Sequence, residues 1–395
     1  MRSAYNETWL RNLSIVKEAK RWKEHNIINA EQLTAIGEEY KSSFFHPNLM
    51  IRILLFIATL IALGGVTGIL ALMFADGFNN EHVMFVLSVF YGVASFAVLE
   101  FIFLKNSKHY KSGVTEAILY HAIGFTLLGI AGIADFDETG VILMCLFLFS
   151  FSAYRYLDLI STAGAFISLA YFIFNELFMI GEATQQPLFQ QVIPIVFIVF
   201  FVPLYFLFKK WQRNISATPW KSCLILLEAL SLLTIYASGN YFVVRELSVS
   251  MLNMYLEEGQ DIPFAFVFYF LTVIMPVIYL YFGIKNKDLV LLRVSLVVIA
   301  FSVFTFKYYF SLGHHEITLT GGDIVLLAIS LYLFRYLKTP KHGYTRENLL
   351  KEKWAGANPE AFVITQTLGG NQVTTNDASG GGGGSFSGGG STDSY

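Results

Sequence analysis

Residues 98–113, VLEFIFLKNSKHYKSG, begin as an apolar run and end with three lysines within seven residues. Apolar side chains are stable in the hydrocarbon of a bilayer, and lysines next to such a run are typical of the cytoplasmic boundary of a transmembrane helix. The stretch therefore predicts the cytoplasmic end of a membrane span. The boundary does not explain Glu100, a carboxylate inside the apolar part.

The composition of the whole chain predicts the same class of protein. Apolar residues make up 55% of the 395 residues and charged residues only 14%, so a soluble domain would lack the polar surface to cover itself. The formal net charge is −2, and basic residues occur in short clusters, which argues against nucleic acid as a partner. Cys145 and Cys223 lie in or beside separate apolar runs, so we predict no disulfide framework.

Ten apolar runs are long enough to cross a bilayer, which takes about 20 helical residues. They lie at 49–74, 83–104, 114–134, 139–157, 159–180, 188–208, 220–240, 263–284, 289–311 and 317–337. Only YRYLD separates the fourth run from the fifth, and Arg155 and Asp158 there favour a tight hairpin over one long helix. The predicted fold class is an all-α, polytopic transmembrane bundle of about ten spans.

The basic residues predict which side each connection faces. All but four of the 27 lysines and arginines lie before the first span, at or after the end of the last one, or in and beside every second connection. The exceptions are Arg52, Arg293 and Lys307 inside spans and Arg245 in an outer connection. Cytoplasmic loops carry the excess of basic residues, so both termini are predicted to be cytoplasmic.

Residues 1–48 are predicted to form a cytoplasmic helical hairpin. An apolar repeat containing Trp9 and Leu13 predicts a first helix that ends near His25, and Asn29 with Gln32 predicts a capping box that starts the second. We expect the hairpin to rest on the membrane surface or on cytoplasmic loops. It has two candidate roles, as a structural lid and as a binding site for a protein partner.

The sequence predicts two further segments after the spans, which occupy 49–337. Residues 338–369 include TRENLLKEKW, which is typical of a basic amphipathic helix at a membrane surface. Residues 370–395 form a glycine-rich tail, predicted to be disordered because glycine offers little area to bury. The tail is a second candidate contact for a protein partner at the cytoplasmic termini.

Five ionisable residues lie in the cytoplasmic third of the predicted spans: Arg52, Glu100, Glu116, Glu228 and Arg293. Such residues are rare in membranes because each costs about 3 kcal/mol to insert, so they are candidates for a functional charge network. The interpretation that we favour for them is structural, as ion pairs or as side chains that reach the headgroups. Glu228 is the deepest, and it is our best candidate for an ion or proton pathway.

A second candidate cluster lies near the outer side, formed by Glu176, Lys307, His314 and Asp323. His314 belongs to an HHE stretch, but neighbouring histidines do not easily face one ion, and the chain has no HExxH or paired CxxC pattern. We therefore expect no metal site. Nucleophile elbows, phosphate-binding loops and dinucleotide fingerprints are also missing, so we expect neither an enzyme nor a cofactor.

Small residues predict close helix contacts in the first and third spans, at Gly64, Gly65, Gly68, Gly124, Gly129 and Gly132. Prolines interrupt the sixth span at Pro194 and Pro203 and the eighth at Pro276. A division into five plus five spans would place these glycines and prolines in corresponding helices of opposite orientation. That arrangement is typical of transporters with inverted repeats.

Three stretches resemble one family: NIINAEQLTAIGEEY (26–40), LGGVTGILALMF (63–74) and FKYYFSLGHHEITLTGGDIVLLAISLYLFRYL (306–337). They are similar to predicted bacterial membrane proteins catalogued as domain of unknown function 2157. The resemblance implies a multi-pass protein of the bacterial inner membrane. It implies no activity and no functional residues.

These observations favour a transporter-like or permease-like protein for a small solute or ion, embedded in the lipid bilayer. The alternative is a non-transporting scaffold or sensor that binds partners through its hairpin and tail. An intramembrane enzyme acting on lipid is a third hypothesis, and the outer cluster around Glu176 and Lys307 holds the only residues that could serve it.

Overall fold

The computed structural model describes residues 3–74, 80–134, 136–184, 187–214, 219–250 and 260–309, together with residues 331 and 335. Within this part of the chain every regular element is a helix and no strand is present. The predicted all-α class is therefore confirmed. The tenth predicted span apart from residues 331 and 335, the amphipathic segment at 338–369 and the glycine-rich tail lie outside the described residues.

Nine of the described helices are long and apolar enough to cross a membrane. They are α3 (Leu49–Met73), α4 (Glu81–Val98) continued by the π-helix η2 (Leu99–Asn106), α5 (Val114–Ala134), α6 (Glu138–Tyr156), α7 (Leu159–Thr184), α8 (Pro187–Gln212), α9 (Lys221–Gly239), α11 (Ala265–Lys285) and α12 (Leu289–Tyr309). Each corresponds to one of the first nine predicted spans. The number of spans that cross a bilayer, and their direction, stay predictions.

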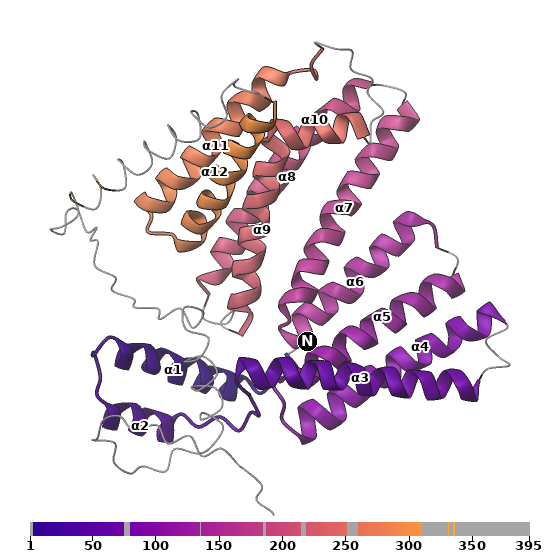
Figure 1. Cartoon of the computed structure of the whole chain (residues 1–395), viewed down its shortest axis with the longest axis vertical. Helices are drawn as coiled ribbons and strands as arrows, with labels where there is room; N and C mark the ends of the chain where they lie inside the picture. The colour runs from indigo at the N-terminus through magenta and orange to yellow at the C-terminus, as the bar shows by residue number, and fades with distance from the viewer. Residues whose placement is uncertain are drawn as a thin grey trace, which may run out of the picture.

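Consecutive helices pack as hairpins: α4 with α5, α6 with α7, α8 with α9, and α11 with α12. Helix α3 packs on α5, and α9 also contacts α7, α11 and α12. In Figure 1, α3 to α7 fan out from the region where the N-terminus lies. The buried apolar side chains form two main cores, one around α5 and the ends of η2 and α6, the other among α7, α8, α9, α11 and α12.

Side-chain contacts show which helix termini share an end of the bundle. Arg52 of α3 pairs with Glu116 of α5, and Lys209 of α8 pairs with Asp288 before α12. We call this the basic end, because the lysine-rich connections at 105–113, 208–214 and 285–287 belong to it. At the opposite end, the far end, Asn240 after α9 donates to Thr305 near the end of α12. The alternation of connections read from the sequence is present in the described helices.

The turn between α6 and α7 has the predicted hairpin form. Leu157 ends α6 with a left-handed backbone at φ 55°. Asp158 then caps α7, because its Oδ2 accepts from the backbone N–H of Ser161 at 2.6 Å. A carboxylate that satisfies a free N–H of the first turn is a strong signal for a helix start. The long apolar stretch therefore forms two helices, α6 and α7, and not one.

The N-terminal hairpin consists of α1 (Glu7–Glu24) and α2 (Ala30–Glu39). Asn29 and Gln32 form the predicted capping box: the Asn29 side chain accepts from the Gln32 backbone at 2.8 Å, and the Gln32 side chain accepts from the Asn29 backbone at 2.9 Å. The first helix ends at Glu24, one residue before His25. Both helices lie beside the basic end in Figure 1.

We expected the N-terminal hairpin to rest either on the membrane surface or on the loops between spans, and in the structure it packs on a loop. Phe45 exchanges backbone hydrogen bonds with the loop between η2 and α5, donating to Lys108 O at 3.0 Å and accepting from Tyr110 N at 3.1 Å. Tyr5 packs edge-on against Tyr110 at 4.9 Å between ring centroids, and Lys108 lies 5.1 Å from the Trp9 ring. The hairpin and the loop thus form one packed unit.

Among the described helices, the glycines of α3 do not make the close helix contacts that the sequence predicted. A Cβ added at Gly64, Gly65 or Gly68 of α3, or at Gly124 of α5, would meet no described atom within 4 Å, so these glycines allow no close contact there. The expected packing role of the first span is therefore wrong for the described chain. Gly129 does make the predicted contact, because an added Cβ would lie 2.5 Å from the Phe85 carbonyl oxygen of α4.

Candidate functional site

The five inner ionisable residues do not form one network through their described contacts. Arg52 and Glu116 pair with each other, with Nη2 and Oε1 2.5 Å apart. Glu100 pairs instead with Arg155, and Glu228 lies near Lys209. Arg293 is exposed on α12. In the described part of the chain these residues therefore form three separate ion pairs at the basic end. Of these, only the pair of Arg52 with Glu116 joins two of the five predicted residues.

The pair between α3 and α5 is fully hydrogen bonded. Besides Arg52, Glu116 accepts from the Gly113 backbone N–H and from Thr115 Oγ1, both at 2.8 Å. Gly113 has φ 89°, and a side chain there would overlap the Arg52 carbonyl. A buried carboxylate that accepts three hydrogen bonds is held in one position. We interpret this pair as a structural staple.

The pair between η2 and α6 has bidentate geometry. Arg155 donates from Nε to Glu100 Oε1 at 2.8 Å and from Nη2 to Oε2 at 3.0 Å. Both side chains are about a quarter exposed, at 28% and 26%. Glu100 lies in the π-helical segment, whose wider turn changes the direction in which its residues point. This ion pair explains the carboxylate inside the apolar run, and it fixes η2 against the end of α6.

The third group is incomplete, and it is the candidate site. Lys209 at the end of α8 donates to Asp288, the residue before α12, and to Tyr205 Oη at 2.9 Å. The second carboxylate, Glu228 of α9, is almost fully buried at 2% exposure. Its Oε1 lies 4.0 Å from Lys209 Nζ, which is too long for a hydrogen bond. One lysine therefore lies between two carboxylates and is bonded to only one of them.

The two oxygens of Glu228 differ in their partners. Oε2 accepts from Gln212 Nε2 at 2.7 Å. Oε1 is buried and has no hydrogen-bond partner among the described residues. A buried polar atom without a partner costs about 1–3 kcal/mol, and more when the group is charged. A proton, a cation or a water molecule that binds to this oxygen would remove that cost.

Of the two carboxylates, Asp288 accepts more hydrogen bonds. Its Oδ1 accepts from the backbone N–H groups of Val290 and Leu291 at 3.0 and 3.1 Å, which starts α12. Burial raises the pKa of Asp288, but hydrogen bonds from Lys209 and from the backbone outweigh it, so the pKa lies below its usual value. Asp288 thus stays ionised and keeps Lys209 charged beside Glu228.

Lys209 and Asp288 were not predicted as site residues. Both lie at the boundaries of apolar runs, where the sequence favours a lysine anchor and a turn carboxylate. Their roles depend on α8, α9 and α12 meeting at the basic end, which no local pattern reveals. The signal that could have indicated them is the deep Glu228, because a buried carboxylate needs a cationic partner.

The predicted outer cluster is not assembled in the described residues. Glu176 of α7 accepts from Thr139 Oγ1 at 3.3 Å, which ties α7 to the start of α6. Lys307 is exposed on α12. The far ends of α7 and α12 are apart in Figure 1. His314 and Asp323 lie outside the described residues.

A different polar group occupies the far end, around the short helix α10 (Tyr241–Ser250). Asp261 accepts from Tyr241 Oη at 2.6 Å and from Tyr269 Oη at 2.8 Å. Burial raises the pKa of Asp261, but these tyrosine hydrogen bonds outweigh it and hold the pKa below its usual value. Arg245 covers the Tyr309 ring at 4.8 Å. The group fixes α10, where the sequence predicts only a long outer connection.

The chain matches no known family, no curated protein and no solved structure. The resemblance to the family of unknown function therefore stays a prediction, and the geometry of the site is the basis for any functional conclusion.

Proposed function

We propose that this protein is a permease-like carrier of the bacterial inner membrane that moves a small solute or ion, and not an enzyme. In this proposal Glu228 binds and releases a proton during the transport cycle. The observation that carries the proposal is the buried Oε1 of Glu228, which has no hydrogen-bond partner in the described part of the chain and lies beside a lysine that is bonded to Asp288. A purely structural ion pair would use both oxygens, as Glu116 and Glu100 do.

Sharing one lysine between two carboxylates gives the group two arrangements. When Glu228 is protonated and neutral, Lys209 forms its ion pair with Asp288. When Glu228 is ionised, it attracts Lys209, because the attraction between opposite charges is strong in a buried environment. The net charge of the three side chains changes from 0 to −1 between these states. Proton binding is thereby coupled to the position of Lys209.

The three side chains come from two different helical hairpins, since Lys209 and Glu228 belong to the α8/α9 hairpin and Asp288 starts α12. A movement of Lys209 from Asp288 to Glu228 would break a contact between these hairpins. Pro203 lies six residues before Lys209 within α8 and cannot donate its helical hydrogen bond. This proline gives α8 a place to bend next to the switching lysine.

The test is transport by protein reconstituted into liposomes, with Glu228→Gln compared with wild type. Solid-supported membrane recordings would present amino acids, organic cations, organic acids, sugars and inorganic ions under an imposed pH gradient. We expect a wild-type current for at least one class, lost in Glu228→Gln. Glu100→Gln is the matched control, because it also removes a carboxylate from the basic end, and it should keep the current. A wild type without current for any class, or an active Glu228→Gln, would contradict the proposal.

A scaffold or sensor is the second candidate function, favoured by the exposed surface of the N-terminal hairpin. Helix α2 has no buried residue, and Trp22, Ile27 and Tyr40 are exposed by 40%, 68% and 39%. A Trp22→Ser, Tyr40→Ser double variant would separate the two functions. A scaffold should lose a co-purifying protein, whereas a carrier should keep its transport current. Removal of residues 370–395 gives the same comparison for the tail.

A further inference from the structure

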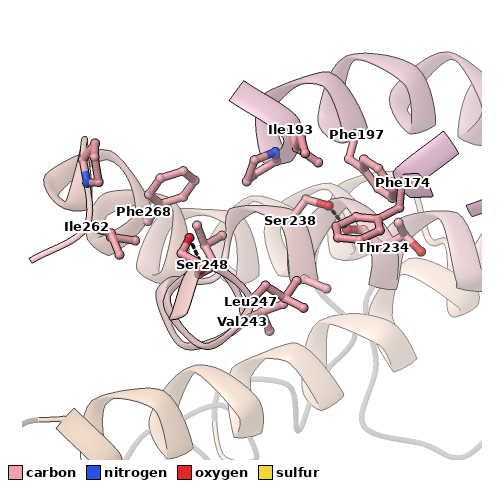
Figure 2. A pocket seen from close by; sticks show the side chains of 14 residues that line it. Phe174, Ile193, Phe197, Thr234, Ser238, Val243, Leu247, Ser248, Ile262 and Phe268 are labelled. Atoms are coloured by element: carbon pink, nitrogen blue, oxygen red, sulfur yellow. Dashed lines mark hydrogen bonds between the residues drawn. The ribbon is translucent and has the colours of Figure 1, made fainter. Parts of the chain in front are cut away.

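A second feature of the bundle is a partly open apolar cavity of about 200 Å³ near the far end. Figure 2 shows the side chains that line it, which come from α7, α8, α9, α10, α11 and the segment before α11. Three phenylalanines from three different helices, Phe174, Phe197 and Phe268, form part of the wall. The cavity is separate from the candidate site, whose residues lie at the basic end of α8 and α9.

The wall of the cavity is suited to an uncharged ligand. None of the described residues that line it carries a charge. Two of its hydroxyl groups donate within their own helices, Ser238 Oγ to Thr234 O at 2.8 Å and Ser248 Oγ to Val244 O at 2.7 Å. A charged group placed here would lose its hydration and gain no counter-charge, which is a large cost.

The size of the cavity corresponds to one or two rings. An apolar cavity of about 150 Å³ is enough to hold benzene, so the volume of about 200 Å³ also accommodates a fused pair of rings. Pro194 of α8 lines the cavity and has no N–H to give to the carbonyl of residue 190, one turn earlier. That carbonyl therefore lacks its usual helical donor.

Helix α10 lines this space and is held in place by residues that do not line it. Val243, Val244 and Leu247 of α10 face the cavity. On the same helix, Tyr241 bonds to Asp261 at 2.6 Å, and Arg245 covers Tyr309. A helix that is apolar toward a cavity and anchored by polar contacts elsewhere acts as a lid, because breaking a few such contacts would release it.

We propose that this cavity is a binding site for an uncharged aromatic molecule of one or two rings that carries at most one hydrogen-bond donor. Indole is the probe that matches this description in size, shape and polarity. The inference stands apart from the proposed transport function, because no residue of the Lys209, Glu228 and Asp288 group lines the cavity.

The test is binding of 5-fluoroindole to the full chain in lipid nanodiscs, followed by fluorine NMR. We expect saturable binding to wild type, and at least a tenfold weaker affinity for Ala237→Leu, which places a larger side chain into the cavity. Ala300→Leu is the matched control, because Ala300 is exposed on α12, and it should bind like wild type. Glu228→Gln should also bind normally, so loss of transport and loss of this site can be told apart.

Three results would overturn the inference. Wild type without saturable binding would show that the cavity does not accept this class of molecule. Equal affinity of wild type and Ala237→Leu would place the probe in the lipid or at another surface. Displacement of the probe by oleate at a lower concentration than by unlabelled indole would assign the cavity to a lipid acyl chain instead. A folded Ala237→Leu protein is verified by its unchanged elution in size-exclusion chromatography.

Discussion

Glu116 and Glu100 look alike in the sequence, but their surroundings give them different importance for stability. Glu116 is buried at 7% exposure and accepts hydrogen bonds from Arg52, Gly113 and Thr115. Glu100 makes one bidentate pair, and its side chain is 26% exposed. Glu116→Gln weakens three hydrogen bonds at a buried carboxylate, whereas Glu100→Gln weakens one ion pair whose two side chains are both partly exposed.

We therefore expect Glu116→Gln to lower the free energy of unfolding by about 2–4 kcal/mol and Glu100→Gln by about 1 kcal/mol or less. Equilibrium unfolding in mixed micelles, followed by circular dichroism, measures both. An Arg52→Gln, Glu116→Gln double variant should be less destabilised than the sum of its single variants, because the two groups interact directly. Equal losses for the two glutamates would contradict the role of burial.

At the residue scale the sequence predicted which ionisable groups are unusual, but mostly not their partners. Arg52 and Glu116 were both predicted, since each is a charge inside an apolar run. Lys209 was not, because a lysine at the end of a span already has a sufficient explanation as an anchor. Its contact with Asp288 joins residues 79 positions apart. Such a contact depends on tertiary packing, which one sequence without an alignment does not encode in any local pattern.

At the element scale, the helices themselves followed from local signals, whereas their contacts did not. Apolar length predicted the nine described helices that are long enough to cross a membrane, and side chains such as Asn29, Gln32 and Asp158 marked helix starts because capping is local. Glycine spacing was a poor guide to packing. Both Gly68 and Gly129 lie in spans, but only Gly129 lies against another helix, since an added Cβ would approach the Phe85 carbonyl and Val89 of α4.

This difference predicts opposite effects of the same substitution. Gly129→Ala should lower the free energy of unfolding by about 1–3 kcal/mol, because α4 and α5 would have to separate. Gly68→Ala should leave it unchanged or raise it by up to about 1 kcal/mol, because alanine favours a helix over glycine. Unfolding in mixed micelles compares the two variants. A strong loss in Gly68→Ala would mean that another copy or segment packs on α3.

The packing of the N-terminal hairpin on the basic end predicts a dependence on pH. The His109 ring lies between Phe45 at 4.7 Å and Phe103 at 5.4 Å, and its Nδ1 is 3.0 Å from Ser112 Oγ. Burial in these contacts lowers the pKa of His109 below its ordinary value near 6.5. When the hairpin is undocked, His109 therefore takes up a proton at a higher pH than it does in the docked state. Docking is fully stable above pH 6.5 and weakens as pH decreases toward the pKa of the docked state.

Hydrogen exchange followed by mass spectrometry checks this expectation in residues 5–24 and 43–47. Protection of these segments should be lower at pH 5.5 than at pH 7.5, after correction for the intrinsic exchange rates. His109→Gln should remove part of the difference, because glutamine does not titrate; His46 packs on Tyr110 in the same contact, and burial also lowers its pKa, so it retains the rest. His82→Gln is the matched control, since His82 is exposed at the start of α4 and should leave the difference intact. A pH response unchanged in His109→Gln would assign it to another group.

At the scale of the whole molecule, the charge distribution determines the predicted orientation. The lysine-rich connections share the basic end with the N-terminal hairpin, and the far end carries the acidic starts of α4 and α6. Nine helices alone would place the two ends of the described chain on opposite sides of a membrane. The prediction that both termini are cytoplasmic therefore depends on residues 317–337 forming a tenth span.

Labelling of single cysteines tests that prediction directly, in a chain whose Cys145 and Cys223 are replaced by alanine. Cysteines at Ser107 and Asn286 should react with a membrane-impermeant maleimide only after the cytoplasmic side is opened, because both positions lie at the basic end. Cysteines at Asn80 and Gln260, at the far end, should react in intact cells. A cysteine at Ser391 then reports on the last span alone. Protection of Ser391 in intact cells supports ten spans, whereas labelling there would leave nine and place the glycine-rich tail outside.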